Sequence, residues 1–510
     1  MRVPRSSGIL LHPTCLPGPF GIGELGKEAY RFADFLADAG QSLWQVLPLG
    51  PTGFADSPYQ LFSTFAGNPL LISLELLAER GWLTRADIEN PPQFSRDAVD
   101  FGRVIPWKSE CLRQASNNFR ARATAADRAA FEEFCSAHAW WLEDFALFMA
   151  LKHAHGGEAV WTKWEPEIAL RRPAAVNAWR ERLARDIENR KFAQWQFFQQ
   201  WDALKRYCAG RGIRIMGDLP IYVAHDSSDV WSHPDFFQLD ENGNPQFVAG
   251  VPPDYFSATG QLWGNPLYRW DRLAETGYRW WCDRVRMALS LLDLLRLDHF
   301  RGFEAYWEVP ADQPTAIVGR WVKGPGADLL LALQAALGDL PLVAENLGVI
   351  TPEVEALRHR FDLPGMAVLM FAFGDDPQAQ SFRPHNYGRN LVAYTGTHDN
   401  DTVMGWWKGA GPGASTRTVE AVREEKDFAR RYLATDGHDV NWVMIRALFK
   451  SVAGVVLVPL QDVLGLGSEA RMNTPALLGN NWRWRFRRDA LTEDLAARLR
   501  EMVKLYGREP

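Results

Sequence analysis

The sequence predicts an α/β fold, a (β/α)8 TIM barrel with helix-rich inserted subdomains between barrel strands and no separate C-terminal β-domain. From residue 6 onward, short apolar runs alternate with amphipathic helical stretches, which is the pattern of βα units around a parallel sheet. Eight such runs are present, and eight parallel strands with crossover helices close into a barrel. The expected strands are Gly8–Leu11, Ser42–Leu49, Ile213–Val223, Leu291–Leu297, Leu342–Glu345, Met366–Phe371, Leu391–Thr395 and Val455–Pro459.

Amphipathic patterns and capping signals predict the helices between these strands. Thr351 suits an N-cap and Pro352 suits the first helical position, because the N–H that proline lacks has no partner there. The expected helices are Glu24–Ala39, Phe197–Ala209, Trp270–Ser290, Ala327–Leu337, Pro352–Arg360 and Thr418–Leu433.

We expect residues 1–510 to form a single catalytic barrel with two insertions. Residues 53–195 are rich in helix patterns and tryptophan and contain no further clear strand, so a mainly helical insertion after the second strand is expected. A loop insertion at residues 224–270 follows the third strand. The active site of such a barrel lies at the carboxyl ends of its strands.

The composition excludes several classes of function. A formal net charge of −6 gives no overall basic face, so neither nucleic acid nor an acidic membrane is an expected partner. The five cysteines are scattered, without C-x-x-C or metal-ligand spacing, so free thiols and no metal are expected. No apolar run reaches about 18 residues, and the N-terminal one is too short for a signal peptide, so we expect a cytoplasmic protein. The 22 Trp, 29 Phe and 12 Tyr exceed what packing usually needs and are typical of sugar stacking.

Acidic residues follow several of the predicted strands. Arg296 and Asp298 are two residues apart at the end of the fourth strand and share a face, so the guanidinium would keep the carboxylate ionised and oriented. Glu345 emerges from an apolar run at the end of the fifth strand, and an apolar setting raises a carboxyl pKa. Asp218 lies near the end of the third strand, and Asp399 follows the seventh. Acids after strands are also common as helix caps, but together these four match a retaining glycosidase site.

Several motifs carry a family resemblance over nearly the whole chain. GDLPIYV, LRLDHFRG, VAENLG and GTHDNDT resemble the signature regions of the α-amylase clan in their amylomaltase form, glycoside hydrolase family 77. SPYQ at 57–60, AGNP at 66–69, residues 250–266 and GLGSEARMNTP at 465–475 also resemble that family. One departure is Ala476, where glycine is expected. The resemblance implies a 4-α-glucanotransferase, with a covalent glucosyl-enzyme intermediate and no cofactor or catalytic metal.

The resemblance also implies residue roles. Asp298 resembles the family's nucleophile, Glu345 its general acid/base and Asp399 its transition-state stabiliser. The substrate-binding candidates are Tyr59, which would stack on the sugar at the scission point, Trp263 on the acceptor side, and Asp218, Arg296, His398, Ser57, Asn346, Tyr255 and Phe256. Plain packing is the alternative for Tyr59 and Trp263, and a core position the alternative for His398. The carboxyl groups of residues 298 and 345 should lie about 5 to 5.5 Å apart, as retention requires.

The expected substrates are maltooligosaccharides and glucans derived from starch or glycogen, with glucose as an acceptor, and the expected assembly is a monomer or a weak homodimer. A covered acceptor side would favour transfer over hydrolysis because water is excluded. Residues 250–264, with aromatic residues and a proline pair, are a candidate cover; a rigid surface turn is the alternative.

Three other functions were weighed. GIGELG at 21–26 spells G-x-G-x-x-G, but prolines separate it from its strand and no acid ends the next strand, so a dinucleotide-binding oxidoreductase is disfavoured. An α-1,4-glucan hydrolase would use the same carboxylates with an open acceptor side. A non-catalytic glucan-binding protein would not need the intact acids. No D-x-D-x-D-G calcium loop is present.

Overall fold

Eight parallel strands form the central sheet of the computed structural model, which describes residues 4–253, 257–409, 418–475, 477 and 479–509. The sheet order is β10-β11-β12-β1-β2-β3-β6-β9. All eight predicted strands are confirmed, as β1 (Ser6–Leu10), β2 (Leu43–Gln45), β3 (Arg214–Leu219), β6 (Leu294–Leu297), β9 (Leu342–Ala344), β10 (Gly365–Val368), β11 (Leu391–Tyr394) and β12 (Val455–Pro459). The fold is therefore the predicted (β/α)8 barrel.

Two seams close the barrel. The first and last strands pair in parallel, with Ser6 opposite Val455 and Leu10 opposite Pro459. At the other seam the N–H of Ala344 in β9 donates to the carbonyl of Pro364, just before β10, at 2.8 Å. A Cβ on Gly8 would lie 2.2 Å from the carbonyl oxygen of Leu43, so β1 approaches β2 as closely as it does only because residue 8 is glycine.

The bounds of several predicted elements differ in the structure, and for two of them the backbone gives the reason. The third strand ends at Leu219 and not at Val223, since Pro220 has no N–H to continue the ladder. The helix predicted over 270–290 is two helices, broken where Gly277 and Tyr278 both have positive φ. The helices around the sheet are α1 (Lys27–Asp38), α10 (Ser228–Ser232), α11 (Trp270–Glu275), α12 (Arg279–Leu291), α13 (Arg301–Glu304), α14 (Ala327–Leu337), α15 (Pro352–Arg360), α16 (Val403–Lys408), α17 (Val419–Leu433), α18 (Val440–Lys450), α19 (Leu460–Val463) and α20 (Glu493–Leu505).

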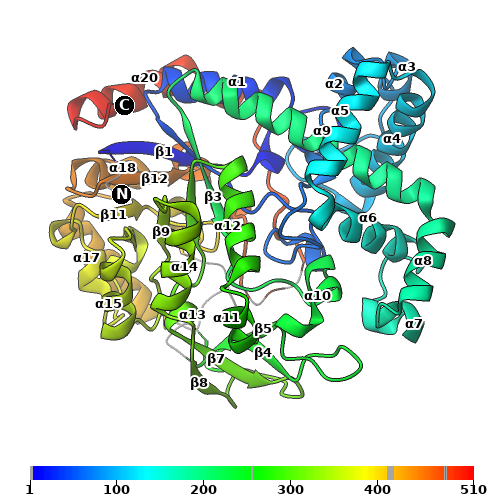
Figure 1. Ribbon diagram of the computed structural model, residues 1–510. Coiled ribbons are helices and arrows are strands. Elements are labelled where there is room, and N and C mark those ends of the chain that lie inside the picture. The colour runs from blue at the N-terminus through cyan, green and yellow to red at the C-terminus, as the bar shows by residue number, and fades with distance from the viewer. Residues whose placement is uncertain (1–3, 254–256, 410–417, 476, 478, 510) are drawn as a thin grey trace.

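Helices also dominate the segment between β2 and β3, which Figure 1 shows in cyan beside the barrel. They are α2 (Leu74–Glu79), α3 (Arg85–Ile88), α4 (Phe101–Arg122), α5 (Ala125–Ala137), α6 (Ala139–Ala154), α7 (Pro166–Ala169), α8 (Pro173–Arg182) and α9 (Ala184–Ala209). The buried amine of Lys108 on α4 forms an ion pair with Glu24, which precedes α1, and donates to the carbonyl of Leu70 at 2.7 Å. Leu70 belongs to the helical segment itself, so it is the ion pair with Glu24 that ties this segment to the barrel.

A second, antiparallel sheet was not predicted. Its order is β5-β4-β7-β8, and it lies at the bottom of the view in Figure 1. Its strands are β4 (Phe247–Val251), β5 (Gln261–Pro266), β7 (Ala305–Pro310) and β8 (Arg320–Lys323). The segment after β3 thus contributes two strands that pair with a hairpin following β6, and β5 carries Trp263.

Short 3-10 helices complete the regular structure of the described residues. They span Pro13–Cys15, Phe54–Asp56, Pro69–Leu71, Trp161–Lys163, Pro234–Phe236, Leu369–Ala372, Ala379–Phe382, Pro384–Asn386, Ser468–Ala470 and Arg488–Ala490. Near the chain end, the buried guanidinium of Arg508 donates to the carbonyls of Ser6 and Ala453, both at 3.1 Å, so it binds both sides of the β1–β12 seam.

Candidate active site

Asp298 and Glu345 follow neighbouring strands of the barrel. The register pairs Leu297 of β6 with Ala344 of β9, and these are the last residues of the two strands. Each acid is the residue directly after its strand. The N–H of Glu345 donates to the carbonyl of Leu297 at 3.1 Å. Neighbouring strands lie about 4.8 Å apart, so the two acids stand side by side at the barrel mouth. The separation of their carboxyl groups stays a prediction.

Arg296 links two of the acids. Its Nη1 lies 2.6 Å from Oδ2 of Asp218, and its Nη2 lies 2.9 Å from Oδ1 of Asp298. The strand register places Asp218 on β3 directly opposite Arg296 on β6. Alternation along β6 accounts for the second contact, because residues two apart share a face. One buried cation therefore orients both carboxylates.

The pKa of Asp298 nevertheless lies above its ordinary value. Burial raises the pKa of Asp298 to about 7 and outweighs the opposing effect of Arg296. The negative charges of Asp218 and Glu345 raise it further. Arg296 acts in the expected direction, because it favours the ionised form of Asp298, but burial outweighs it and the pKa is raised overall.

Glu345 is held by two backbone amides. Oε2 accepts from the N–H of His299 at 2.8 Å, and Oε1 accepts from the N–H of Leu347 at 2.8 Å. Burial raises the pKa of Glu345, while Arg296 and these two amides oppose the rise. The direction agrees with the sequence expectation for a proton donor, and the amides fix where the carboxyl group points.

His398 and Asp399 form a pair at the end of β11. Nε2 of His398 lies 3.3 Å from Oδ2 of Asp399. The amide of Asn473 donates to Oδ1 of Asp399 at 2.6 Å, and the N–H of Asn473 donates to the carbonyl of His398 at 3.1 Å. Both carboxylate oxygens of Asp399 therefore have a neighbouring polar group from this chain.

This pairing sets the charge of both side chains. Burial alone would raise the pKa of Asp399, but His398 and the Asn473 amide outweigh it and hold that pKa well below its usual range. Burial alone would lower the pKa of His398, but Asp399 outweighs it, and the pKa is raised. The arrangement thus favours an ionised Asp399 beside a protonated His398.

A buried acid clamps the loop that carries this pair. Asp462 accepts from the hydroxyl of Thr395 at 2.6 Å and from the N–H of Val403 at 2.7 Å, so it binds both ends of the loop. Burial raises the pKa of Asp462 to about 6. No cation pairs with it among the described residues, and its role was not predicted.

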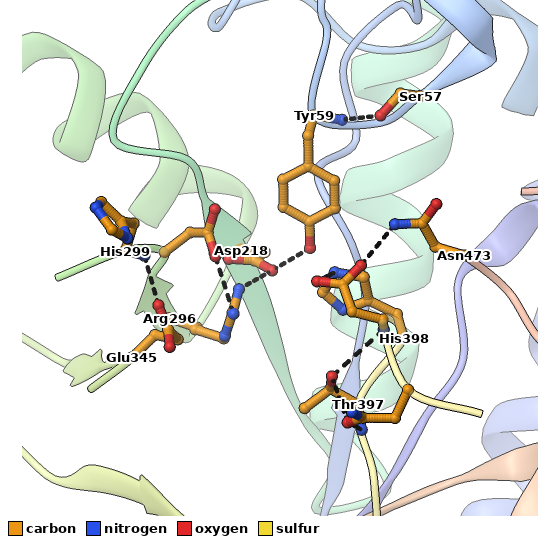
Figure 2. Close-up of polar contacts among 12 residues, drawn as sticks. Ser57, Tyr59, Asp218, Arg296, His299, Glu345, Thr397, His398 and Asn473 are labelled. Atoms are coloured by element: carbon orange, nitrogen blue, oxygen red, sulfur yellow. Dashed lines mark hydrogen bonds and ion pairs between the residues drawn. The ribbon is translucent and has the colours of Figure 1, made fainter. Parts of the chain in front are cut away.

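Figure 2 shows Tyr59 between Asp218 on one side and His398 on the other, and it contacts both. Its hydroxyl donates to Oδ2 of Asp218 at 2.6 Å. Its ring stacks on the His398 ring, with centroids 5.0 Å apart and planes at 15°, and lies 5.8 Å from the ring of Trp482. The hydroxyl of Ser57 accepts from the N–H of Tyr59 at 3.2 Å, so Ser57 holds the turn that presents the ring.

One buried oxygen of the site has no partner in the described part of the chain. Oδ2 of Asp218 is bound by Arg296 and Tyr59, but Oδ1 accepts no hydrogen bond. A buried unpaired acceptor costs free energy, about 1–3 kcal/mol. A ligand hydroxyl that donated to Oδ1 would remove this cost, which fits a sugar-binding role for Asp218.

The remaining candidates have different surroundings. Trp263 is half-buried, and its ring meets the ring of His299 edge-on with centroids 4.7 Å apart. Asn346 donates to Oε1 of Glu355 at 2.7 Å and accepts from the N–H of Met366 at 2.7 Å, so its amide already binds within the protein. Tyr255 and Phe256 lie outside the described residues, and so does Ala476.

Sequence reasoning missed four contributors to the site. Asn473 and Trp482 come from the C-terminal region and contact His398 or Asp399, and the backbone of His299 binds Glu345. The fourth is Arg471, whose side chain donates to the carbonyl of Asp399 at 2.8 Å. The GLGSEARMNTP motif contains two of these residues, so the resemblance at that motif was an available signal.

Comparison with known proteins identifies the family. A family model described as 4-alpha-glucanotransferase matches residues 11–492. The chain belongs to the 4-α-glucanotransferase family. It is accordingly an enzyme, and the resemblance of its motifs to amylomaltases is confirmed.

Relatives of the 4-α-glucanotransferase family match the chain from end to end. The 4-alpha-glucanotransferase of Thermus thermophilus is 52% identical, with 100% of both chains covered. That of Synechocystis sp. is 50% identical, over 99% of this chain and 98% of the relative. The solved amylomaltase from Streptococcus agalactiae in complex with acarbose superposes with a TM-score of 0.93 at 39% identity, over 99% of this chain and 100% of that chain.

The described residues contain neither a membrane-spanning helix nor a metal-binding cluster. No helix among them is both long and apolar enough to cross a membrane. In the same residues, no group of three or more His, Cys, Asp or Glu side chains is arranged to hold a metal ion.

Proposed function

We propose that this enzyme transfers segments of α-1,4-glucan from a donor to an acceptor by a retaining double displacement. Asp298 is the nucleophile, Glu345 the general acid/base and Asp399 the stabiliser of the transition state. One observation carries the proposal: Asp298 and Glu345 follow neighbouring strands in register, and only Asp298 of the two forms an ion pair with Arg296. Retention requires two close carboxyl groups with different tasks.

The first step forms the covalent intermediate. A carboxylate oxygen of Asp298 attacks C1 of the donor sugar, and the bond from C1 to the glycosidic oxygen breaks. Glu345 gives its proton to that oxygen, so the leaving chain departs with a free 4-hydroxyl. A glucosyl ester on Asp298 remains, and Glu345 is now ionised.

The two carboxyl groups share one proton before this step. The contact with Arg296 favours the ionised form of Asp298, while burial raises the pKa of Glu345 and favours its protonated form. Burial also raises the pKa of Asp298, so only part of the enzyme carries the charge on Asp298 near neutral pH.

The second step reverses the first with another partner. Glu345 takes the proton of an acceptor 4-hydroxyl, whose oxygen attacks C1 and releases Asp298. Maltooligosaccharides, glucans derived from starch or glycogen, and glucose are the proposed acceptors. Water at the same place would give hydrolysis, so a cover that residues 250–264 form over the acceptor side remains part of the proposal.

The other site residues bind the sugar at the scission point. The ionised Asp399 faces the positive charge that develops on the sugar ring, and Oδ1 of Asp218 accepts a sugar hydroxyl. Tyr59 offers a ring face, and His398, whose pKa Asp399 raises, offers a ring N–H as donor. Trp263 lies on the acceptor side.

We also infer the organisation of the protein. Residues 1–510 form one catalytic barrel, residues 53–195 a helical insertion, and residues 224–270 a part of the acceptor side. A cytoplasmic monomer or weak homodimer is the proposed state.

Pure maltotriose tests the function. A transferase yields free glucose together with chains longer than three sugars, because one product segment is passed to another molecule. Products would be separated by chromatography at several times. If only chains shorter than maltotriose appear, the enzyme is a hydrolase, and if no product appears, the proposal fails.

A further inference from the structure

The residue after the proposed nucleophile has an unusual backbone. His299 has φ 51°, in the left-handed region that residues other than glycine rarely adopt. In this conformation its N–H points at Glu345 and donates to Oε2 at 2.8 Å, as the dashed line in Figure 2 shows. Strained backbone of this kind persists only where the surroundings hold it.

The surroundings of the His299 ring supply that restraint. The ring meets Trp263 edge-on with centroids 4.7 Å apart. The His299 ring packs closely against Gly302. A Cβ at position 302 would lie only 3.1 Å from Cδ2 of His299, so a larger residue there would crowd the ring. The N–H of Gly302 also donates to the carbonyl of His299 at 2.9 Å. Ring and peptide are thus fixed together.

We propose that His299 is a positioning residue for the acid/base Glu345: its left-handed peptide aims an N–H at the carboxyl group, and Trp263 and Gly302 hold the peptide in that conformation. The inference rests on the proposed function, since it assigns a task to the acid/base of that reaction. It also gives Trp263 a second effect, because an acceptor sugar in contact with this ring would restrain the same peptide.

The groups around Glu345 determine how its pKa would change if the N–H of His299 no longer donated to it. Arg296 and the N–H groups of His299 and Leu347 lower its pKa, and Asp218 and Asp298 act in the opposite direction. Removing the His299 contact takes away one group that favours the ionised form. The pKa of Glu345 should then rise, and the alkaline limb of the pH profile should move to higher pH.

Two variants separate the peptide from the imidazole. His299→Asn and His299→Val both remove the ring, but asparagine tolerates the left-handed region whereas a β-branched residue does not. We expect His299→Val to have a kcat for maltotriose about tenfold below that of His299→Asn, which is the population change that the left-handed penalty implies. We also expect an alkaline limb shifted upward in the Val variant alone.

Each outcome decides between explanations. If the two variants lose kcat equally and keep the alkaline limb of the wild type, the imidazole acts on its own and the inference is wrong. A Val variant with reduced folded content, measured by circular dichroism and thermal unfolding, would be replaced by His299→Ala in the same comparison. The wild type tests the proposed function separately: if it makes no chains longer than maltotriose, that function fails whatever the variants do.

Discussion

The guanidinium of Arg296 lies 2.9 Å from Oδ1 of Asp298, yet the pKa of this carboxyl group remains raised to about 7. Burial destabilises the ionised form of Asp298 more than Arg296 stabilises it. The guanidinium is shared, because the same arginine also binds Asp218. Asp298, the proposed nucleophile, is therefore only partly ionised near pH 7.

A pH profile tests this balance. Asp298 attacks as an anion, so kcat/KM for maltotriose should fall as the pH drops through a midpoint near 7. Lysine cannot contact both acids as the planar guanidinium does, so Arg296→Lys should raise the pKa of Asp298 further and move the acid limb to higher pH. An acid limb in the wild type near the ordinary aspartate value would contradict the argument.

The two carboxyl groups should be separately indispensable. Asp298→Asn removes the nucleophile and should lower the transfer rate by several powers of ten, and Glu345→Gln removes the proton donor and should cost about 10²–10⁴ in rate. Glucose release and chain elongation from maltotriose measure both. Circular dichroism serves as the folding control, and substantial activity in either variant would overturn its assignment.

Two substitutions of Tyr59 separate the contribution of its ring to catalysis from that of its hydroxyl. Tyr59→Phe keeps the stack on His398 but removes the hydrogen bond to Asp218, so kcat/KM should fall about tenfold, the value of one hydrogen bond to a charged group. Tyr59→Ala removes the ring as well and should lose clearly more. Equal losses in the two variants would mean that the ring face does not contact the sugar.

The proposed cover over the acceptor side can be tested by substitution of its aromatic residues. Replacing Tyr255 and Phe256 with alanine should lower the ratio of transfer to hydrolysis, because water would reach the glucosyl ester more often. The ratio follows from free glucose and total reducing ends during maltotriose conversion. An unchanged ratio would rule out a water-excluding role for these two residues.

Asp462 should matter although it is assigned no part in the proposed reaction. Asp462→Ala leaves the buried hydroxyl of Thr395 and the N–H of Val403 without their acceptor, at a cost of about 1–3 kcal/mol each in the free energy of unfolding. Transfer should weaken too, because the loop that carries His398 and Asp399 loses its clamp. Denaturant unfolding and maltotriose assays measure the two effects.

Asp462→Asn is the matched control, since its amide can still accept from Val403 and donate to Thr395. The pKa of Asp462 is raised in the folded protein from 3.8 to about 6, so the stability that the carboxyl group contributes is complete at low pH and declines as the pH rises through 6. The Asn variant should therefore gain relative to the wild type as the pH rises. A constant difference would argue against a buried, uncompensated charge.

The barrel could be predicted because its signals are local. Each strand is a short apolar run, and the helix at 352–360 begins at the predicted proline. The antiparallel sheet has no such signal, since β4 pairs with β7 about sixty residues later in the chain and both strands are short. Helix α9 begins at Ala184, well before the predicted start. The prediction missed its first part because the polar residues there interrupt the apolar pattern of a helix.

In the site, too, local contacts could be predicted from the sequence and long-range ones could not. Alternation along β6 was enough to bring Arg296 and Asp298 together. The contact of Asn473 with Asp399 joins residues 74 positions apart, and only the folded chain reveals it. The raised pKa of Asp298 also escaped prediction, since burial depends on every segment that surrounds the mouth.

The pairing of β1 with β12 has a consequence for synthesis. Ser6 is synthesised early, but Val455, with which it pairs, is synthesised only when nearly the whole polypeptide has been made. Until then β1 exposes an unpaired edge, which is the kind of surface on which nascent chains aggregate. Such long-range pairing also makes folding slow. Cotranslational assembly should therefore end with this seam, after which Arg508 secures it.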